Sequence, residues 1–458
     1  LMFGLGITLL IVIAAIGIFL ATFDANQYKQ DLADAVKQQT GRELLFQGDI
    51  GLTLYPSLGM KLGSLSFANA PGFGAQPMLS VNKVSVSVDV LSLLAFSPEI
   101  AQLELDGLSV DLQQNSQGKT NWDDLVSSAE ETAQPSVAAP DAADQSPQAA
   151  TALDIKGAFG GLNITNAQLK WADASSGVAY QVNKLSAQTG RIAMGESFPL
   201  TLKLALQSPN EFNADIALQA EVLLAAEKLS LTSLKLETSA QGALIPVDKL
   251  MLTMMGDVDF SLANNRLSIN GFSTQIKTSG GVLQSSDTRL AGEIGFDLNQ
   301  QRLTIAVLDL RSDLQGADVP NGKMQAAISA SKLDLQLDKR AVAVDDLVLA
   351  LNENQFKGFV RVDDYAQPAL SFALASERFD VDKLMGVVAQ PEVITPVESP
   401  DAPAKDIQIQ LPMELLRSLR LDGKLTVGSL KTQGLTLNDV ALKMNASKGV
   451  IDVNPIAI

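Results

Sequence analysis

The chain has 458 residues, with 51 acidic and 34 basic side chains, and it contains neither histidine nor cysteine. Its net charge of −17 argues against a nucleic-acid partner, because phosphate binding needs concentrated lysine and arginine. The lack of histidine and cysteine excludes disulfides, Ser-His-Asp triads, Cys-His nucleophiles and zinc fingers. No cluster of Asp, Glu, Ser or Lys stands out, so we predict a protein that is not an enzyme and that has no cofactor or metal ion.

The first 23 residues form one uncharged apolar run that ends at Asp24. A helix of this length covers about 34 Å, enough to cross a hydrocarbon core of about 30 Å. The alternative is a cleaved signal peptide, but its apolar core is shorter, about 7–15 residues, and Phe23 stands where a small residue is preferred. We therefore predict an uncleaved transmembrane anchor over residues 1–23. Its large apolar side chains include Leu5, Leu9, Ile11, Ile13, Ile16 and Phe19.

A short helix is expected directly after the anchor. Residues 25–40 place Tyr28, Leu32, Ala35 and Val36 on one face, and Gly41 suits the end of the helix. Residues 24–43 carry four acidic and three basic side chains. Because cytoplasmic flanks are usually rich in lysine and arginine, this flank indicates the exported side of the membrane.

From residue 50 onward the apolar side chains recur at every second position, which predicts strands with one apolar and one wet face. Within residues 103–112 the phase of this alternation slips by one at Gly107, which indicates a bulge or turn there. The clearest alternating positions, which we take as the candidate lining of an apolar groove, are Val84, Val86, Val88, Val90, Leu103, Leu105, Leu202, Leu204, Ile216 and Leu218.

One pentapeptide, VDKLM, occurs twice, at residues 247–251 and 381–385. The apolar spacing around each copy is helical, so we predict two short helices between strands. Residues 412–419 predict a third helix of the same kind.

Two stretches, residues 127–152 and 389–406, are poor in large apolar side chains and rich in alanine, proline and acidic residues. Neither can bury enough surface to offset its ordering, so both are predicted to be flexible linkers. They divide the chain into an anchor (1–23), a head of helix and β-structure (24–126), an elongated β region (153–388) and the start of a C-terminal region (407–458). We expect this last region to continue beyond Ile458.

The head carries a closely spaced series of turn and capping motifs. Pro71-Gly72 and Phe73-Gly74 suit a turn. Asn121 is placed to cap a short helix that begins at Trp122, with Asp123 in its first turn, and Trp122 is expected to anchor that helix in the core. The remaining structural positions in the series are Gly41, Arg42, Gly48 and Pro56.

In this order, behind one apolar segment, the motifs resemble the N-terminal region of the AsmA family of Gram-negative inner-membrane proteins. The resemblance returns at residues 411–425, with an L-P-x-E-L-L…L-D-G-x-L pattern. It implies a single-pass inner-membrane protein whose bulk lies in the periplasm and which serves outer-membrane biogenesis. Larger relatives are thought to conduct phospholipid between the two membranes along a groove lined by apolar side chains. The implied partners are therefore the inner membrane, phospholipid, and an outer-membrane or periplasmic protein.

The expected fold is mainly β with a few short helices, built as an elongated, twisted, half-pipe-like antiparallel sheet. A β-sandwich or a solenoid would give the same alternation. A second possible function is a scaffold for outer-membrane proteins, which would hold client strands by β-augmentation. A glycosidase with paired carboxylates is the weakest possibility, since no such pair stands out.

Overall fold

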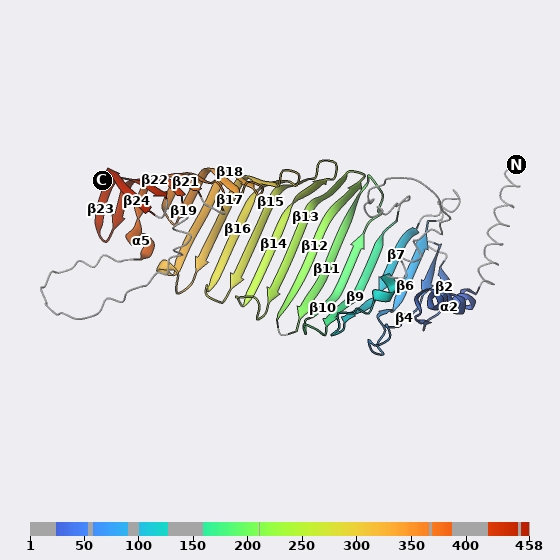
Figure 1. The fold of residues 1–458 in the computed structure, drawn as a ribbon. Helices are drawn as coiled ribbons and strands as arrows, with labels where there is room; N and C mark the ends of the chain where they lie inside the picture. Colours follow the sequence, from blue (N-terminus) through green and yellow to red (C-terminus); the bar gives the residue numbers. More distant parts are fainter. Residues whose placement is uncertain are drawn as a thin grey trace, which may run out of the picture. The chain divides into compact units, whose positions relative to one another are not determined.

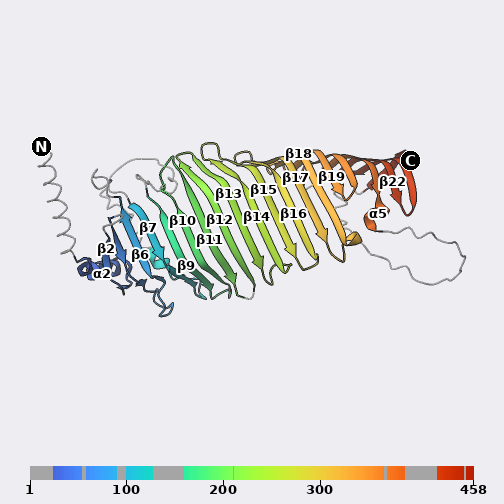
Figure 2. The same cartoon turned by 180° about the vertical axis from the view of Figure 1, so that it is seen from behind.

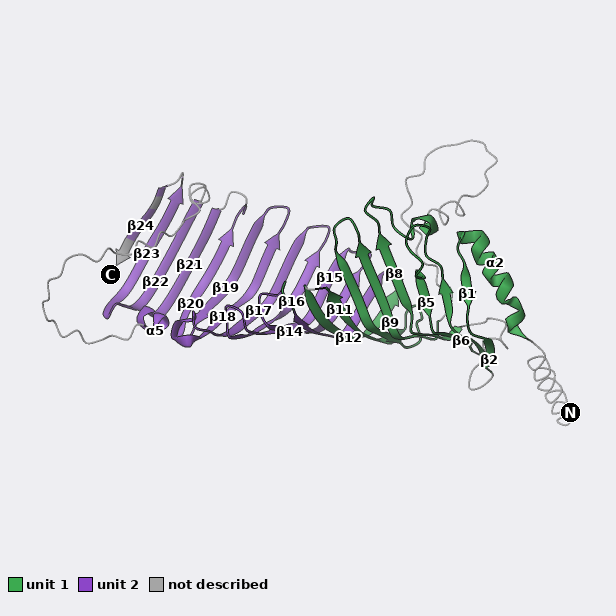
Figure 3. Cartoon of the chain, turned by 90° about the horizontal axis from the view of Figure 1, so that it is seen from below, with its two compact units in different colours: residues 1–226, 242–244 green, residues 227–241, 245–458 purple. Residues whose placement is uncertain are grey.

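A computed structural model describes residues 24–53, 58–89, 100–126, 159–209, 211–365, 369–386, 420–447 and 450–457. The predicted anchor, both predicted linkers, the predicted helix at 412–419, Pro56 and Val90 lie outside these residues. The chain divides into two compact units, residues 1–226 with 242–244 and residues 227–241 with 245–458 (Figure 3). We call them unit 1 and unit 2.

The chain is mainly β, as predicted. Unit 1 begins with η1(Ala25–Tyr28) and α2(Lys29–Thr40) and continues with twelve strands. These are β1(Leu44–Phe46), β2(Ile50–Thr53), β3(Leu58–Leu62), β4(Leu65–Phe67), β5(Leu79–Val81), β6(Lys83–Val88), β7(Ile100–Asp106), β8(Ser109–Gln114), β9(Leu162–Asp173), β10(Ala179–Thr189), β11(Ser197–Ser208) and β12(Phe212–Ala225).

Unit 2 contains the other twelve described strands and two short helices. Its elements are β13(Lys228–Gln241), β14(Lys249–Ser261), β15(Arg266–Ser279), β16(Ser285–Asp297), β17(Arg302–Gln315), η2(Pro320–Gly322), β18(Lys323–Gln336), β19(Ala341–Leu351), β20(Asn354–Val362), β21(Ala369–Asp380), α5(Val381–Met385), β22(Arg420–Thr432), β23(Leu435–Ser447) and β24(Val450–Ala457).

The strands of unit 2 lie beside one another in chain order, from β13 to β24 (Figure 1). All but one of these pairings are antiparallel, and the exception is the parallel pair β21–β22. The prediction of a purely antiparallel sheet was therefore wrong at this point. The connection from β21 to β22 passes through residues 387–419, and a connection of that length allows a parallel return that a hairpin does not.

In unit 1, four long strands are each broken in the middle, giving β1 and β2, β3 and β4, β5 and β6, β7 and β8. The breaks lie side by side, at Gly48, Gly63, Asn82 and Gly107. A Cβ on Gly48 would stand 2.6 Å from the Cα of Gly63, so only glycine allows this approach of the two backbones. Gly107 has a φ of +67°, which confirms the predicted break in phase there.

The last broken strand joins the head to the rest of unit 1. Both of its halves, β7 and β8, pair in parallel with β9: Leu105 lies opposite Ile164, and Leu112 lies opposite Trp171. From β9 the sheet continues antiparallel through β10 and β11 to β12. These parallel pairs are a second departure from the prediction.

Each unit is a single layer. Among the described elements, the strands that contact one another appreciably are hydrogen-bonded neighbours, so no second sheet packs across the face of the first. The strands from β9 to β12 of unit 1 and from β13 to β17 of unit 2 can be followed from both sides (Figures 1 and 2). A β-sandwich needs two facing layers, and the open sheet therefore favours the groove over the sandwich.

The VDKLM prediction was right for one copy only. Residues 381–385 form α5, which begins after Asp380, whose carboxylate accepts a hydrogen bond from the backbone N–H of Lys383 at 2.9 Å. Residues 249–251 of the first copy instead begin β14. That copy has no such cap and runs into the alternating residues Leu250, Leu252 and Met254, which pair with two neighbouring strands.

Candidate functional site

The candidate site is the apolar face of the sheet, and in unit 1 it contains the residues that the sequence singled out. Val84 lies opposite Leu105 and Val86 lies opposite Leu103, on β6 and β7. Leu202 lies opposite Leu218 and Leu204 opposite Ile216, on β11 and β12. The last described member, Val88, lies opposite Ile100.

These two groups belong to one continuous surface. Leu105 is opposite Ile164 on β9, which is opposite Ala187 on β10, and Ala187 is opposite Leu202 on β11. None of the nine predicted lining residues that the structure describes is fully buried or fully exposed. Their half-buried state is what a single layer gives, because strand neighbours cover the sides of each side chain and no second layer covers its tip.

Unit 2 carries the same kind of face on a larger scale. Two rows of side chains cross it in direct register from strand to strand, and both rows are apolar at every position from β13 to β21. The first row is Leu231, Val258, Ile269, Ile294, Ile305, Leu333, Val344, Val360 and Phe372. The second row is Leu229, Phe260, Leu267, Phe296, Leu303, Leu335, Val342, Val362 and Leu370.

A line of irregular residues crosses β13 to β20 beside the first row, and we call it the crease. On β13, β15, β17 and β19 one residue adopts a left-handed conformation, and on β14, β16, β18 and β20 a small residue stands at the crease. The left-handed residues are Ser233, Gly271, Val307 and Asp346. The small residues are Gly256, Gly292, Ala330 and Gly358. Such bulges bend a strand and increase its twist.

The bend turns the two arms of each strand toward the apolar face. At the crease the apolar side is covered: Leu234, Ala330 and Leu347 are each at most 6 % exposed. On the opposite side, Val307 is 70 % exposed. Crowding on one side and exposure on the other mark the apolar face as the inner side of the bend. We call the half of unit 2 that carries the two apolar rows the first arm, and the half beyond the crease the second arm.

The glycines of the crease were missed as functional positions. Each interrupts an otherwise alternating strand, and an isolated glycine within such a pattern is a known sign of a bulge or a close backbone approach. At Gly358 a Cβ would stand 1.7 Å from the carbonyl oxygen of Ala373, and at Gly292 it would stand 2.9 Å from the Cγ2 of Ile305. The two apolar rows of unit 2 follow the same alternation in the sequence, but none of their residues is among the predicted lining residues.

The opposite face of unit 2 is charged. Asp334 pairs with Arg302 and, at 3.1 Å, with Lys332, and these partners lower the pKa of Asp334 to about 2, the hydrogen bond from Arg302 being the largest cause. Further along, Arg289 lies opposite Arg311, each beside an aspartate of its own strand. The two faces therefore differ sharply in polarity.

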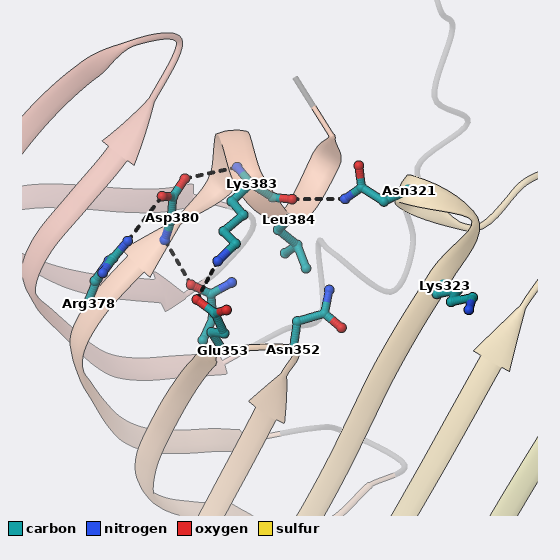
Figure 4. A pocket seen from close by; sticks show the side chains of 9 residues that line it. Asn321, Lys323, Asn352, Glu353, Arg378, Asp380, Lys383 and Leu384 are labelled. Atoms are coloured by element: carbon teal, nitrogen blue, oxygen red, sulfur yellow. Dashed lines mark hydrogen bonds and ion pairs between the residues drawn. The ribbon is translucent and has the colours of Figure 1, made fainter. Parts of the chain in front are cut away.

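A polar cavity of about 370 Å³ lies beside α5 (Figure 4). Four of its charged groups contact one another in pairs: Lys383 is 2.6 Å from Glu353, and Arg378 is 3.5 Å from Asp380. The backbone N–H of Lys383 lowers the pKa of Asp380, and the side chain of Lys383 lowers that of Glu353. These contacts hold α5 against the strand ends, so we assign the cavity a structural role.

The head motifs meet at Arg42, which is 3 % exposed. Its guanidinium donates two hydrogen bonds to the carboxylate of Asp124, one of them at 2.9 Å, and one to the carbonyl oxygen of Asn121 at 2.8 Å. It also lies 5.5 Å from the ring centre of Phe67. Arg42 therefore ties the end of α2 to the 120–125 turn, some eighty residues further along the chain.

We call the contacts around Arg42 the arginine hub. Asn121 belongs to this hub, and its side chain has no exposed surface. Its side chain accepts a hydrogen bond from the N–H of Gln113 at 2.9 Å and donates to the carbonyl oxygen of Asp111 at 2.8 Å and to the Oδ1 of Asn69 at 2.9 Å. Its predicted role as a helix cap was therefore wrong, because its side chain bonds the backbone of β8 and the side chain of Asn69 instead. The N–H of Thr120 donates to the carboxylate of Asp123 at 2.8 Å, which fixes the start of this turn.

The other head positions behave as structural residues. Gly41 ends α2 with a φ of +72°. The N–H of Phe73 donates to the carbonyl oxygen of Ala70 at 3.1 Å, and Gly72 has a φ of +93°, which places Pro71 and Gly72 in a turn as predicted; Gly74 shares that φ. Trp122 packs against Trp171 of β9, with ring centres 5.5 Å apart.

The predicted apolar face of the N-terminal helix is not buried among the described residues: Tyr28 is 46 % exposed and Leu32 is 47 % exposed. No helix in the described parts of the chain is long and apolar enough to span a bilayer. The predicted anchor residues precede the first described residue.

The open single-layer sheet and its apolar face place the chain in a class of mainly β proteins that expose an apolar surface along a sheet. In the comparison with known families, the AsmA family matches residues 1–458, so the chain belongs to that family. No curated protein matches the chain closely enough to be reported as a relative.

Proposed function

We propose that this AsmA-family protein binds phospholipid by laying acyl chains against the apolar face, and that it serves the transfer of lipid to the outer membrane. The observation that carries the proposal is the pair of unbroken apolar rows on the first arm of unit 2, which no second layer covers in the described residues. A soluble partner with a polar surface would gain nothing from such a face, whereas an acyl chain gains about 0.8 kcal/mol per buried methylene.

The family match supports a place in the bacterial envelope. We propose that residues 1–23 anchor the chain in the inner membrane and that the described units lie in the periplasm. The protein would then conduct lipid without catalysis. A scaffold that captures client strands has less support, because each strand from β14 to β23 already has a neighbour on both sides.

A photo-crosslinking residue placed at Ile305 in the full chain, in Gram-negative cells, tests the proposal. Ile305 lies on the apolar face, and its neighbour Thr304 lies on the opposite face of the same strand and is exposed to a similar degree. We expect crosslinks to phospholipid at position 305 and none at position 304, detected by mass spectrometry. Equal lipid labelling at both positions would contradict the proposal, and crosslinks to outer-membrane proteins alone would favour the scaffold.

A further inference from the structure

The two arms of unit 2 differ in chemistry on the same inner face. The first arm is apolar at every position of its two rows from β13 to β21. On the second arm, the inner positions of β15, β16 and β17 include five hydroxyl side chains, which we call the hydroxyl patch. It consists of Thr274, Thr278, Ser286, Thr288 and Ser312.

Four of the five hydroxyls are bonded in pairs across neighbouring strands, and the fifth, on Thr274, donates to the carbonyl oxygen of Thr253 at 3.2 Å. Thr278 and Ser286 lie opposite each other with their oxygens 2.6 Å apart, and Thr288 and Ser312 lie opposite each other at 2.8 Å. All four side chains are half-buried. They share their face with apolar side chains of the same three strands, which are Ile276, Leu290, Leu310 and Leu314.

Each bonded pair leaves one O–H donor and several lone pairs unused, because a pair has two donors and its bond uses one. Charged side chains of these strands, such as Lys277, Arg289 and Arg311, stand on the opposite face at alternate positions. The patch is thus uncharged and offers hydrogen-bond donors beside an apolar surface. The matching ligand is an amphiphile whose polar part carries acceptor oxygens.

We call the inner side of the bend in unit 2, between the first and second arms, the trough. We propose that a phospholipid lies across this trough, with its acyl chains against the first arm and its ester and phosphate oxygens on the hydroxyl patch. This inference rests on the proposed function and adds the orientation of the lipid. The polar part of the lipid then occupies one side of the trough at β15 to β17. An acyl chain on the patch would leave the free hydroxyls without partners, which is unfavourable where water is displaced.

Two photoreactive phosphatidylethanolamines test this orientation with the purified full chain, one carrying a diazirine on its head-group amine and the other on an acyl terminus. We expect the head-group probe to label the second arm at β15 to β17 and the acyl probe to label the first arm, as mapped by mass spectrometry. Thr288→Val combined with Ser312→Ala removes two hydroxyls with little change of shape. Head-group labelling at the patch should fall about two- to twelvefold, since a hydrogen bond contributes about 0.5–1.5 kcal/mol and 1.4 kcal/mol is tenfold.

Thr304→Val combined with Ser268→Ala is the matched control, because it removes one threonine and one serine hydroxyl from the opposite face of β17 and β15. We expect head-group labelling of the patch to stay unchanged in this control. Thermal unfolding checks that each variant folds, and Ser312→Ala alone replaces the double variant if that one does not. Labelling of both arms by both probes, unaffected by the loss of the hydroxyls, would overturn the orientation while lipid binding stands. Labelling by neither probe would instead overturn the proposed function.

Discussion

Arg42 shows how a single buried side chain can unite motifs that are far apart in the sequence. Its guanidinium bonds the Asp124 carboxylate through two nitrogens and reaches the carbonyl oxygen of Asn121 as well. Only a planar fork of donors can make all three contacts from one position, and a lysine offers a single point of charge. The hub therefore depends on arginine itself and not on positive charge alone.

We expect Arg42→Lys to lower the stability of unit 1 by about 2 kcal/mol, because the buried carbonyl oxygen of Asn121 loses its partner. Chemical denaturation followed by circular dichroism measures the change. Arg191→Lys is the control, since Arg191 pairs with Glu196 at the surface, where such a change stays within about 0.5 kcal/mol. Equal stability of Arg42→Lys and the parent protein would show that the hub contributes only charge.

At the scale of elements, the two copies of VDKLM show that local sequence does not decide between helix and strand. The second copy follows Asp380, whose carboxylate caps the new helix, and its own Asp382 accepts hydrogen bonds from the N–H groups of Gln433 at 2.6 Å and Gly434 at 2.8 Å. The first copy continues into residues that two neighbouring strands pair with. Tertiary hydrogen bonds outweigh the shared pentapeptide.

The crease gives the sharpest prediction at this scale. In Gly358→Ala the new methyl group would stand 1.7 Å from the carbonyl oxygen of Ala373, at a φ of +158° that side chains rarely adopt. We expect a loss of about 3 kcal/mol or more in the stability of unit 2. Gly51→Ala, where no atom lies within 4 Å, is the same substitution in a strand and should cost less than about 1 kcal/mol. Similar unfolding midpoints for the two variants would mean that the bend does not need glycine.

For the whole molecule, alternation in the sequence predicted the strands and the half-buried face, because a period of two follows directly from strand geometry. It selected Val84 and Leu105 for the same face but did not predict that they are neighbours, since pairing partners depend on the register between distant segments. The alternation did not predict the crease, for a similar reason. A left-handed residue such as Val307 has no local sequence signature, because the strands on either side impose its conformation. The contacts of the arginine hub could not be predicted from the sequence, because they join residues about eighty positions apart.

Substitution at neighbouring positions of β6 tests the open face in the whole chain. Val86→Asp places a carboxylate on the apolar face, where it stays partly hydrated without lipid, so we expect a folded protein that retains less lipid. Ser87→Asp, on the other face, should change neither. Thermal unfolding and the mass of co-purified lipid measure both variants. Unfolding of Val86→Asp, with no stable lipid-poor form, would indicate a covered core at this strand.

The alternation within the crease also sets how a chain of this design can change in length. From β13 to β20 a strand with a left-handed residue is always followed by a strand with glycine or alanine at the bend. The smallest increment that preserves this order is a hairpin, such as residues 266–297, and two strands widen a sheet by about 9.6 Å. A chain of this design could thus lengthen or shorten its sheet by copying or deleting hairpins. A single added strand would break the alternation, because it would place two left-handed residues or two small residues side by side at the crease.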